Sequence, residues 1–449
     1  MKVKYPLTRY PVNARTYRRV EDGWENLEAV QKQRQSEYIL RMGQYTPKQE
    51  ALVIDFSTKE ISNASGRVWW AAGSNKEDDP YAFPAFYNCS GILFKNYYDF
   101  IRPFTNLFLG CGQGEVILND WSRFEKLIEP LSRYDQKLFN LPLIKNVFNL
   151  TMTGEFGKYG PQHPDYTEVT KLYVGAGVIT IEIGDSREGW ASAYNLLLEL
   201  YTNGSYYLED KEKKGVPTKG DINYNELNIN GYELNIDISS VRPYGTPIKG
   251  FGGIANPLYL ETFFRAVVNK LNSVCILQDG VLSTLDISLL LNECGALAVS
   301  GNIRRSAKIN QFLYDDPTSD AKMGLYRQDE DGNWVVDTEK QALKYSNFTK
   351  MYFEKPTYEQ IEGAVTSQYF SGEGAIQYVP VAIARANIDL FDNEEDAIKQ
   401  VSKAYEDSTE LELFKELLKR KYDLEEDTPE LFKELFHRLT RFQLNPCGK

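Results

Sequence analysis

YNCSGILFKNYYDFIRPFTNLFLGCGQGEVIL (Tyr87–Leu118) is the stretch that decides the fold of this chain. Tyr87–Phe94 has the β-prone composition of a strand, and the segment after it, rich in tyrosine and phenylalanine, has a helical composition. The glycine-rich Gly110–Gly114 predicts a tight loop, and Glu115–Leu118 predicts a second strand. A strand, a helix and a strand in succession indicate an α/β fold.

The same alternation continues through the middle of the chain. Local patterns predict strands at 174–183 and 304–313, helices at 256–273, 286–299 and 357–370, a hairpin with a two-residue turn at Asn230-Gly231, and an exposed, turn-rich stretch at 314–349. We see no internal repeat. The interpretation is therefore an N-terminal helical region over 1–80 and an α/β region over 81–449.

Composition excludes several classes of partner. The 449 residues carry a net charge of −12, which argues against nonspecific binding to nucleic acid or to an anionic membrane. Much of this acidity lies in 392–441, where amphipathic spacing predicts a solvated helical segment. No signal peptide and no apolar run of ~20 residues is visible, so a cytoplasmic location is expected.

The cysteines and histidines do not form a metal-binding pattern. Five scattered cysteines show no C-x-x-C spacing, and with only two histidines in the chain no zinc-finger pattern is present. No metal site is therefore expected. Cys294 falls on the apolar stripe of a predicted helix, and Cys275 and Cys111 also have structural interpretations. His163 and His437 are expected on the surface.

Eight short segments in order resemble the monomeric, adenosylcobalamin-dependent ribonucleoside-triphosphate reductases. The most telling are RPYGTPIKGFGG (Arg242–Gly253) and SGNIRRSAKI (Ser300–Ile309). The others are GRVWW (Gly66–Trp70), Asn88-Cys89-Ser90, the loop Gly110–Gly114, DSREGW (Asp185–Trp190), SGEGAIQY (Ser371–Tyr378) and the final NPCG (Asn445–Gly448).

The resemblance implies a ten-stranded α/β barrel made of two halves of five parallel strands, of which this chain contains the first half. A finger loop in the barrel carries the radical cysteine. Residues from about 115 to 285 resemble the family's effector-binding segment. Arg304 and Arg305 could bind phosphate or form ion pairs, and we favour the structural role.

The resemblance also implies the reaction and its participants. A thiyl radical takes the 3′ hydrogen of a ribonucleoside triphosphate, and two cysteines then reduce the 2′ position. The implied cofactors are adenosylcobalamin, held mainly by segments beyond this chain, a deoxynucleoside triphosphate effector, and Mg²⁺ with the nucleotide phosphates. The implied partners are a complementary C-terminal polypeptide and a thioredoxin-type reductant.

Three residues are the catalytic candidates. Cys447 matches the radical cysteine, since a weak S–H bond suits hydrogen-atom transfer and Asn445-Pro446 places the thiol in a turn. Cys89 matches a redox cysteine on the first strand, although a small core residue is the simpler reading of a strand cysteine. Asn445 resembles a residue that orients the substrate, and it could equally serve only to start the turn.

Two further groups of residues are expected to bind ligands. Asn88, Ser90 and Gly448 are expected to contact the substrate. Gly110, Gly112 and Gly114 would allow backbone N–H groups to approach a phosphate, although such loops are also ordinary tight turns.

One departure from the family pattern affects activity. Lys449 stands where the family has a glutamate base, and an ammonium group cannot accept a proton. The isolated chain is therefore expected to be inactive, to come from a gene that is split or interrupted at the NPCG motif, and to be poorly stable without its second half. The alternatives are a catalytically silent deoxynucleotide-binding module and an unrelated α/β protein.

Overall fold

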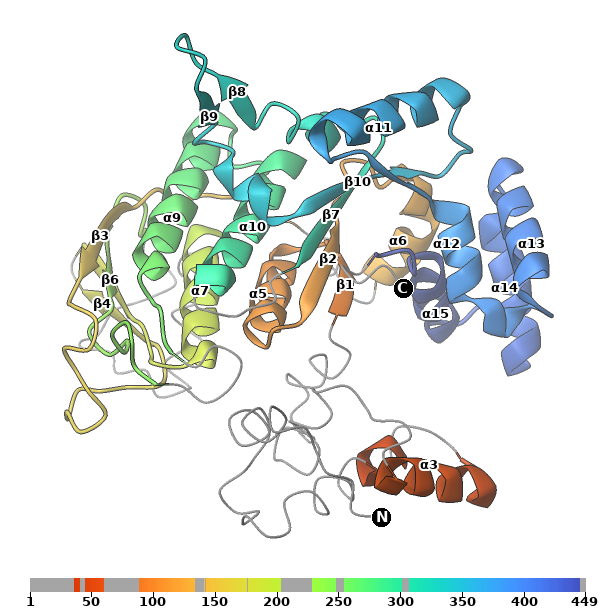
Figure 1. The fold of residues 1–449 in the computed structure, drawn as a ribbon, viewed down its shortest axis with the longest axis horizontal. Coiled ribbons are helices and arrows are strands. Elements are labelled where there is room, and N and C mark those ends of the chain that lie inside the picture. The colour runs from red at the N-terminus through yellow and green to blue at the C-terminus, as the bar shows by residue number, and fades with distance from the viewer. Residues whose placement is uncertain are drawn as a thin grey trace.

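A five-stranded sheet organises the computed structural model, which describes residues 36–40, 45–59, 89–133, 141, 143–175, 177–202, 228–247, 254–300 and 307–444. Every neighbouring pair of strands in this sheet is parallel (Figure 1). In spatial order the strands are β1 (Cys89–Leu93), β2 (Gly112–Val116), β7 (Lys308–Leu313), β10 (Asn347–Tyr352) and β11 (Ala375–Tyr378). The predicted α/β class is confirmed.

Helices connect the strands, as parallel pairing requires. The described α-helices are α3 (Pro47–Lys59), α5 (Ile101–Phe108), α6 (Glu125–Ser132), α7 (Arg187–Thr202), α9 (Tyr259–Leu277), α10 (Thr284–Ser300), α11 (Tyr358–Ser371), α12 (Val379–Ala386), α13 (Glu394–Glu406), α14 (Glu410–Tyr422) and α15 (Pro429–Leu439). None of them is both long enough and apolar enough to cross a membrane. The predicted helices at 256–273, 286–299 and 357–370 correspond to α9, α10 and α11.

A second sheet lies on the α7 and α9 side of the molecule (Figure 1). Its order is β3 (Asn149–Thr153), β6 (Glu233–Asp237), β5 (Val178–Glu182) and β4 (Lys171–Gly175). The strand predicted at 174–183 is confirmed over β5 but wrong in its first residues, because β4 and β5 form an antiparallel hairpin that turns at Gly177, with φ +76°. Glycine adopts this backbone conformation without the strain that a Cβ atom causes.

Two other local predictions differ from the structure in part. Among the described residues, β6 pairs in parallel with β3 on one edge and with β5 on the other, so neither of its edges is left for the hairpin predicted around Asn230-Gly231. The stretch 314–349 does contain the exposed hairpin of β8 (Tyr326–Gln328) and β9 (Trp334–Val336), but it ends in β10, an interior strand of the main sheet. Tertiary pairing overrode the turn-rich composition in both places.

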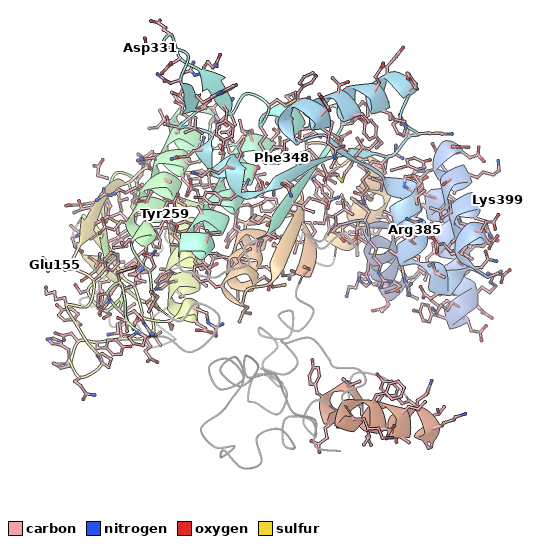
Figure 2. All side chains as sticks on the ribbon, viewed as in Figure 1. Glu155, Tyr259, Asp331, Phe348, Arg385 and Lys399 are labelled. Atoms are coloured by element: carbon pink, nitrogen blue, oxygen red, sulfur yellow. The ribbon has the colours of Figure 1, made fainter. Side chains whose placement is uncertain are left out.

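Side-chain alternation gives the main sheet two different faces. The first, which we call the Phe312 face, packs Phe312 and Phe348 into a large apolar core with α5, α9 and α10. Figure 2 labels Phe348 on β10. The opposite face, which we call the Cys89 face, carries Leu93, Val116 and Met351 near the carboxyl ends of the strands.

The acidic segment covers this part of the Cys89 face. Its helices α13, α14 and α15 bury apolar side chains such as Val401, Phe414 and Leu435 in the second core, while charged residues such as Lys399 point outward (Figure 2). Asn393 and Thr428 cap α13 and α15 by accepting backbone N–H bonds. The predicted helical character of 392–441 is confirmed, and the charge lies on the solvated side of helices that pack against the sheet.

Candidate functional site

Cys89 is the first residue of β1 and is partly exposed. It stands in register with Gly112 of β2, on the same face as Gly91. The thiol of Cys89 therefore belongs to the amino-terminal part of the Cys89 face, beyond the area that the acidic helices cover.

The structure does not place the side chain of Ser90 beside Cys89. The Ser90 hydroxyl donates a hydrogen bond to Gln113 Oε1 at 2.6 Å and accepts one from Asn106 Nδ2 at 3.0 Å. Asn106 is on α5, which covers the Phe312 face, so successive residues of β1 point in opposite directions. The Ser90 hydroxyl thus serves the packing of α5, and Asn88 lies outside the described residues.

Only the first part of the glycine stretch is a loop. Gly110, with φ +69°, makes the turn after α5, whereas Gly112 and Gly114 lie inside β2. Since β2 is paired on both edges, its backbone N–H groups are used by the sheet, for example from Gln113 to Ala307 at 2.9 Å. The predicted open phosphate loop is therefore wrong for Gly112 and Gly114.

Two buried glutamines hold the last described residues against the Cys89 face. Gln377 Nε2 donates to the carbonyl of Phe442 at 2.8 Å, and the backbone N–H of Leu444 donates to Gln311 Oε1 at 2.6 Å. Gln311 Nε2 also donates to Gln377 Oε1 at 2.6 Å, across β10. We call Gln311 and Gln377 the glutamine clamp.

The clamped segment passes directly over β1. A Cβ atom on Gly91 would lie 2.6 Å from Cβ of Gln443 and 3.6 Å from the carbonyl oxygen of Leu444. The chain therefore approaches β1 two residues from Cys89, where only a glycine leaves enough room. Asn445, Cys447 and Gly448 lie outside the described residues, and Leu444 precedes Cys447 by three positions.

The glutamine clamp was missed in the sequence. The usable signal was the polarity of Gln311 and Gln377, because strands inside a parallel sheet are usually near-continuous apolar runs. A buried carboxamide there needs hydrogen-bond partners, and here the partners are backbone groups of a segment more than sixty residues away.

Substitution of Gly91 tests this geometry. Gly91→Ala is expected to displace Gln443 and Leu444, because the added methyl group overlaps Gln443, and overpacking of this kind typically costs about 1–3 kcal/mol. A short thiol-to-thiol cross-linker such as dibromobimane, followed by peptide mapping, should join Cys89 to Cys447 at least ~5-fold less efficiently in the variant. Gly324→Ala is the matched control, since its new Cβ meets no atom within 4 Å. Equal yields in the two variants would contradict the close approach.

A charged pair lies on the opposite face of the same strands. Glu115 of β2 and Lys308 of β7 are both fully buried, and Lys308 Nζ is 2.7 Å from Glu115 Oε1. Burial raises the pKa of Glu115 to about 7, although Lys308 and a hydrogen bond from Asn310 oppose the shift. Because this pair points away from Cys89, we assign it to the support of the sheet.

Two of the quoted motifs meet where the chain leaves β5 and β6 of the second sheet. Arg242 Nε donates to both carboxylate oxygens of Asp185, at 2.9 and 3.0 Å, and Tyr166 donates to the same group at 3.1 Å. Ser186 caps α7, since its Oγ accepts a hydrogen bond from the N–H of Gly189 at 2.8 Å. The contact between Arg242 and Asp185 joins the beginning of RPYGTPIKGFGG to the beginning of DSREGW and assigns no effector ligand.

The remaining predictions concern single residues. Cys294 is fully buried, as expected, and burial raises its pKa to about 12. Cys111 is buried and Cys275 is partly buried, which agrees with their structural interpretations. His163 and His437 have side chains that are 41% and 61% exposed. Arg304 and Arg305 lie outside the described residues.

The fold and the site define an α/β protein in which a cysteine opens the edge strand of a parallel sheet and a clamped segment leads to a second cysteine. The chain is 30% identical over 164 residues to the adenosylcobalamin-dependent ribonucleoside-triphosphate reductase of Lactobacillus acidophilus. It is 32% identical over 150 residues to the enzyme of that name from Lactobacillus leichmannii. It is 35% identical over 147 residues to a probable enzyme of that name from Dictyostelium discoideum.

These comparisons confirm the resemblance drawn from the motifs. The matches cover 36%, 32% and 32% of this chain. They cover only 17%, 17% and 15% of the relatives' own lengths. No family model matches the chain, and no solved structure matches it. The similarity therefore supports ribonucleotide reduction at the level of the family.

Proposed function

We propose that this chain provides the N-terminal part of the catalytic core of an adenosylcobalamin-dependent ribonucleoside-triphosphate reductase, with Cys447 as radical cysteine and Cys89 as redox cysteine. The observation that supports this proposal most directly is the approach of Leu444 to β1, two residues from Cys89. Three further residues of extended chain span at most about 11 Å, so Cys447 is within reach of the region above Cys89. The five parallel strands are, in this proposal, half of the ten-stranded barrel.

In the reaction proposed for the chain's own residues, one ribonucleotide is reduced and two thiols are oxidised. A thiyl radical on Cys447 takes the hydrogen atom from C3′ of the ribose and returns it at the end of the cycle. Cys89 and a second thiol of the complete protein supply two electrons and two protons, the 2′ hydroxyl leaves as water, and the two sulfurs form a disulfide. Asn445 orients the substrate, and a thioredoxin-type reductant restores the thiols.

Adenosylcobalamin, when bound, supplies the radical that activates the thiol of Cys447. The described residues contribute to this activation in one way: the glutamine clamp fixes the backbone segment that leads to Cys447. The carboxamides of Gln311 and Gln377 bond to each other and to the backbone of Phe442 and Leu444. We therefore assign the residues that hold the cofactor to other segments of the complete protein.

The direct test combines the chain with the complementary polypeptide, adenosylcobalamin, a deoxynucleotide effector, Mg²⁺ and a dithiol. Conversion of a ribonucleoside triphosphate to its deoxy form is the expected result, measured by chromatography. Lys449, in place of the family's glutamate, favours the second candidate, a silent deoxynucleotide-binding module. Effector binding without turnover under every such condition would support that second candidate and contradict the first.

A further inference from the structure

A cavity of about 490 Å³ lies at the other end of the main sheet from Cys89. Its wall includes residues that follow β2, β7 and β10, together with the first turns of α6 and α14. In open α/β sheets, ligands bind preferentially at the carboxyl ends of the strands. The chemistry proposed above uses the amino end of β1 and does not involve this cavity.

The floor of the cavity is apolar. Leu313, Met351, Phe353 and Leu439 line it, and three of these side chains are more than nine-tenths buried. The guanidinium of Arg123 covers the ring of Phe353, 4.8 Å from its centroid. This floor suits the hydrocarbon part of a ligand.

Two buried polar atoms on the wall have no hydrogen-bond partner among the described residues. They are the hydroxyl of Tyr405, a residue that is only 5% exposed, and the carboxylate oxygen Oε2 of Glu410. The other oxygen of Glu410 has only a loose ion pair, 3.5 Å from Arg123 Nη1. Buried polar groups are nearly always satisfied, so both atoms point to a ligand that donates hydrogen bonds. Burial, with the nearby negative charge of Glu410, also raises the pKa of Tyr405, which keeps its hydroxyl neutral.

The charge around the cavity favours a cation. Six carboxylates line it against two cationic side chains, Arg123 and Lys126. Glu410 and Glu412 lie in the first turn of α14, where acidic side chains already complement the positive end of the helix. An anionic ligand would face this excess negative charge.

We propose that the cavity binds a primary ammonium group carried on an apolar stem. An ammonium group has three donors and no acceptor, which matches a carboxylate oxygen and a hydroxyl oxygen that both lack a donor. The stem then lies over Leu313, Met351 and Phe353. The same chemistry is offered by a small free amine and by a lysine side chain of a partner protein.

Calorimetric titration of the full chain at fixed ionic strength tests the proposal with matched probes. Hexylamine is expected to bind at least ~10-fold more tightly than hexan-1-ol, because the two share a stem and differ in the charged donor. Nα-acetyl-lysine methylamide separates the two sources: its binding indicates a lysine side chain, and binding of hexylamine alone indicates a free amine. Equal binding of hexylamine and hexan-1-ol would overturn the proposal.

Three variants separate binding from folding. Tyr405→Phe removes only the unpartnered hydroxyl and should weaken hexylamine binding about fivefold, and Glu410→Gln should weaken it at least tenfold. Glu416→Gln is the control, since it removes an exposed carboxylate of the same helix that does not line the cavity, and it should change the affinity less than about twofold. Thermal unfolding curves establish that each variant is folded. An affinity that is unchanged in folded Tyr405→Phe and Glu410→Gln would overturn the assignment.

Discussion

Cys447→Ala is expected to lower the rate of deoxynucleotide formation by the reconstituted reductase at least about a thousandfold, since loss of a group that makes and breaks bonds has effects of this size or larger. Alanine has no S–H bond, so it can neither form the radical nor take the 3′ hydrogen. Single-turnover assays with chromatographic detection of the product provide the measurement. Effector binding, measured separately, should remain within about twofold, because a methyl group in place of a thiol changes no charge.

The variant Cys89→Ala separates the two sulfur roles. It should also abolish product formation, because it removes one of the two thiols proposed to donate electrons, whereas the proposed radical thiol of Cys447 should still exchange the 3′ hydrogen of the substrate. Cys275→Ala is the matched control, since Cys275 is a partly buried thiol on α9, and its rate should stay within about twofold. Activity that survives Cys447→Ala would remove the radical assignment, whatever happens to Cys89.

The sequence predicted the elements whose signals are local. Helices α9, α10 and α11 have strong apolar periodicity or clear caps, and Thr357 forms the capping box that begins α11. The composition of Tyr87–Phe94 predicted a strand there, and β1 occupies Cys89–Leu93. In each case the information lay within about twenty residues.

The missed features depend on contacts between distant segments. The strand β10 lies in a stretch with turn-rich composition, and its place between β7 and β11 follows from the sheet as a whole. The glutamine clamp joins β7 and β11 to Phe442 and Leu444, and neither glutamine has a local partner that would reveal its role. The contact between Glu115 and Asn310 spans 195 residues. A single sequence contains the polarity of such residues but not their pairing.

The buried ion pair between Glu115 and Lys308 predicts a large loss of stability in the variant Lys308→Met. Removing one partner of a buried ion pair leaves an uncompensated group in a medium of low polarity, which typically costs about 3–5 kcal/mol of unfolding free energy. Lys308 Nζ also donates to the carbonyl of Leu291 at 2.7 Å, so the variant loses that bond as well. Urea unfolding at pH 8, followed by circular dichroism, should show the loss.

The stability lost in Lys308→Met should depend on pH, and the titration of Glu115 sets the direction of this dependence. Its pKa of about 7 in the folded state lies above the ordinary value of 4.5, so the folded state holds a proton that the unfolded state releases between these pH values. The contribution of Glu115 to stability therefore falls as pH rises from 4.5 through 7. Without Lys308 the carboxyl group is harder still to ionise, and the fall should extend to higher pH. Lys308→Met should accordingly cost less at pH 5 than at pH 8.

Two further variants isolate the charge from the packing. In Glu115→Gln/Lys308→Met neither side chain is ionised, so part of the stability lost in Lys308→Met should return, together with a flatter dependence on pH. Lys403→Met removes an ammonium group whose side chain is 72% exposed and which pairs with Asp407 at 2.9 Å, and exposed pairs contribute at most about 1 kcal/mol. A loss in Lys308→Met no larger than that in Lys403→Met, or equal losses at pH 5 and pH 8, would mean that the charges of Glu115 and Lys308 do not hold β2 and β7 together.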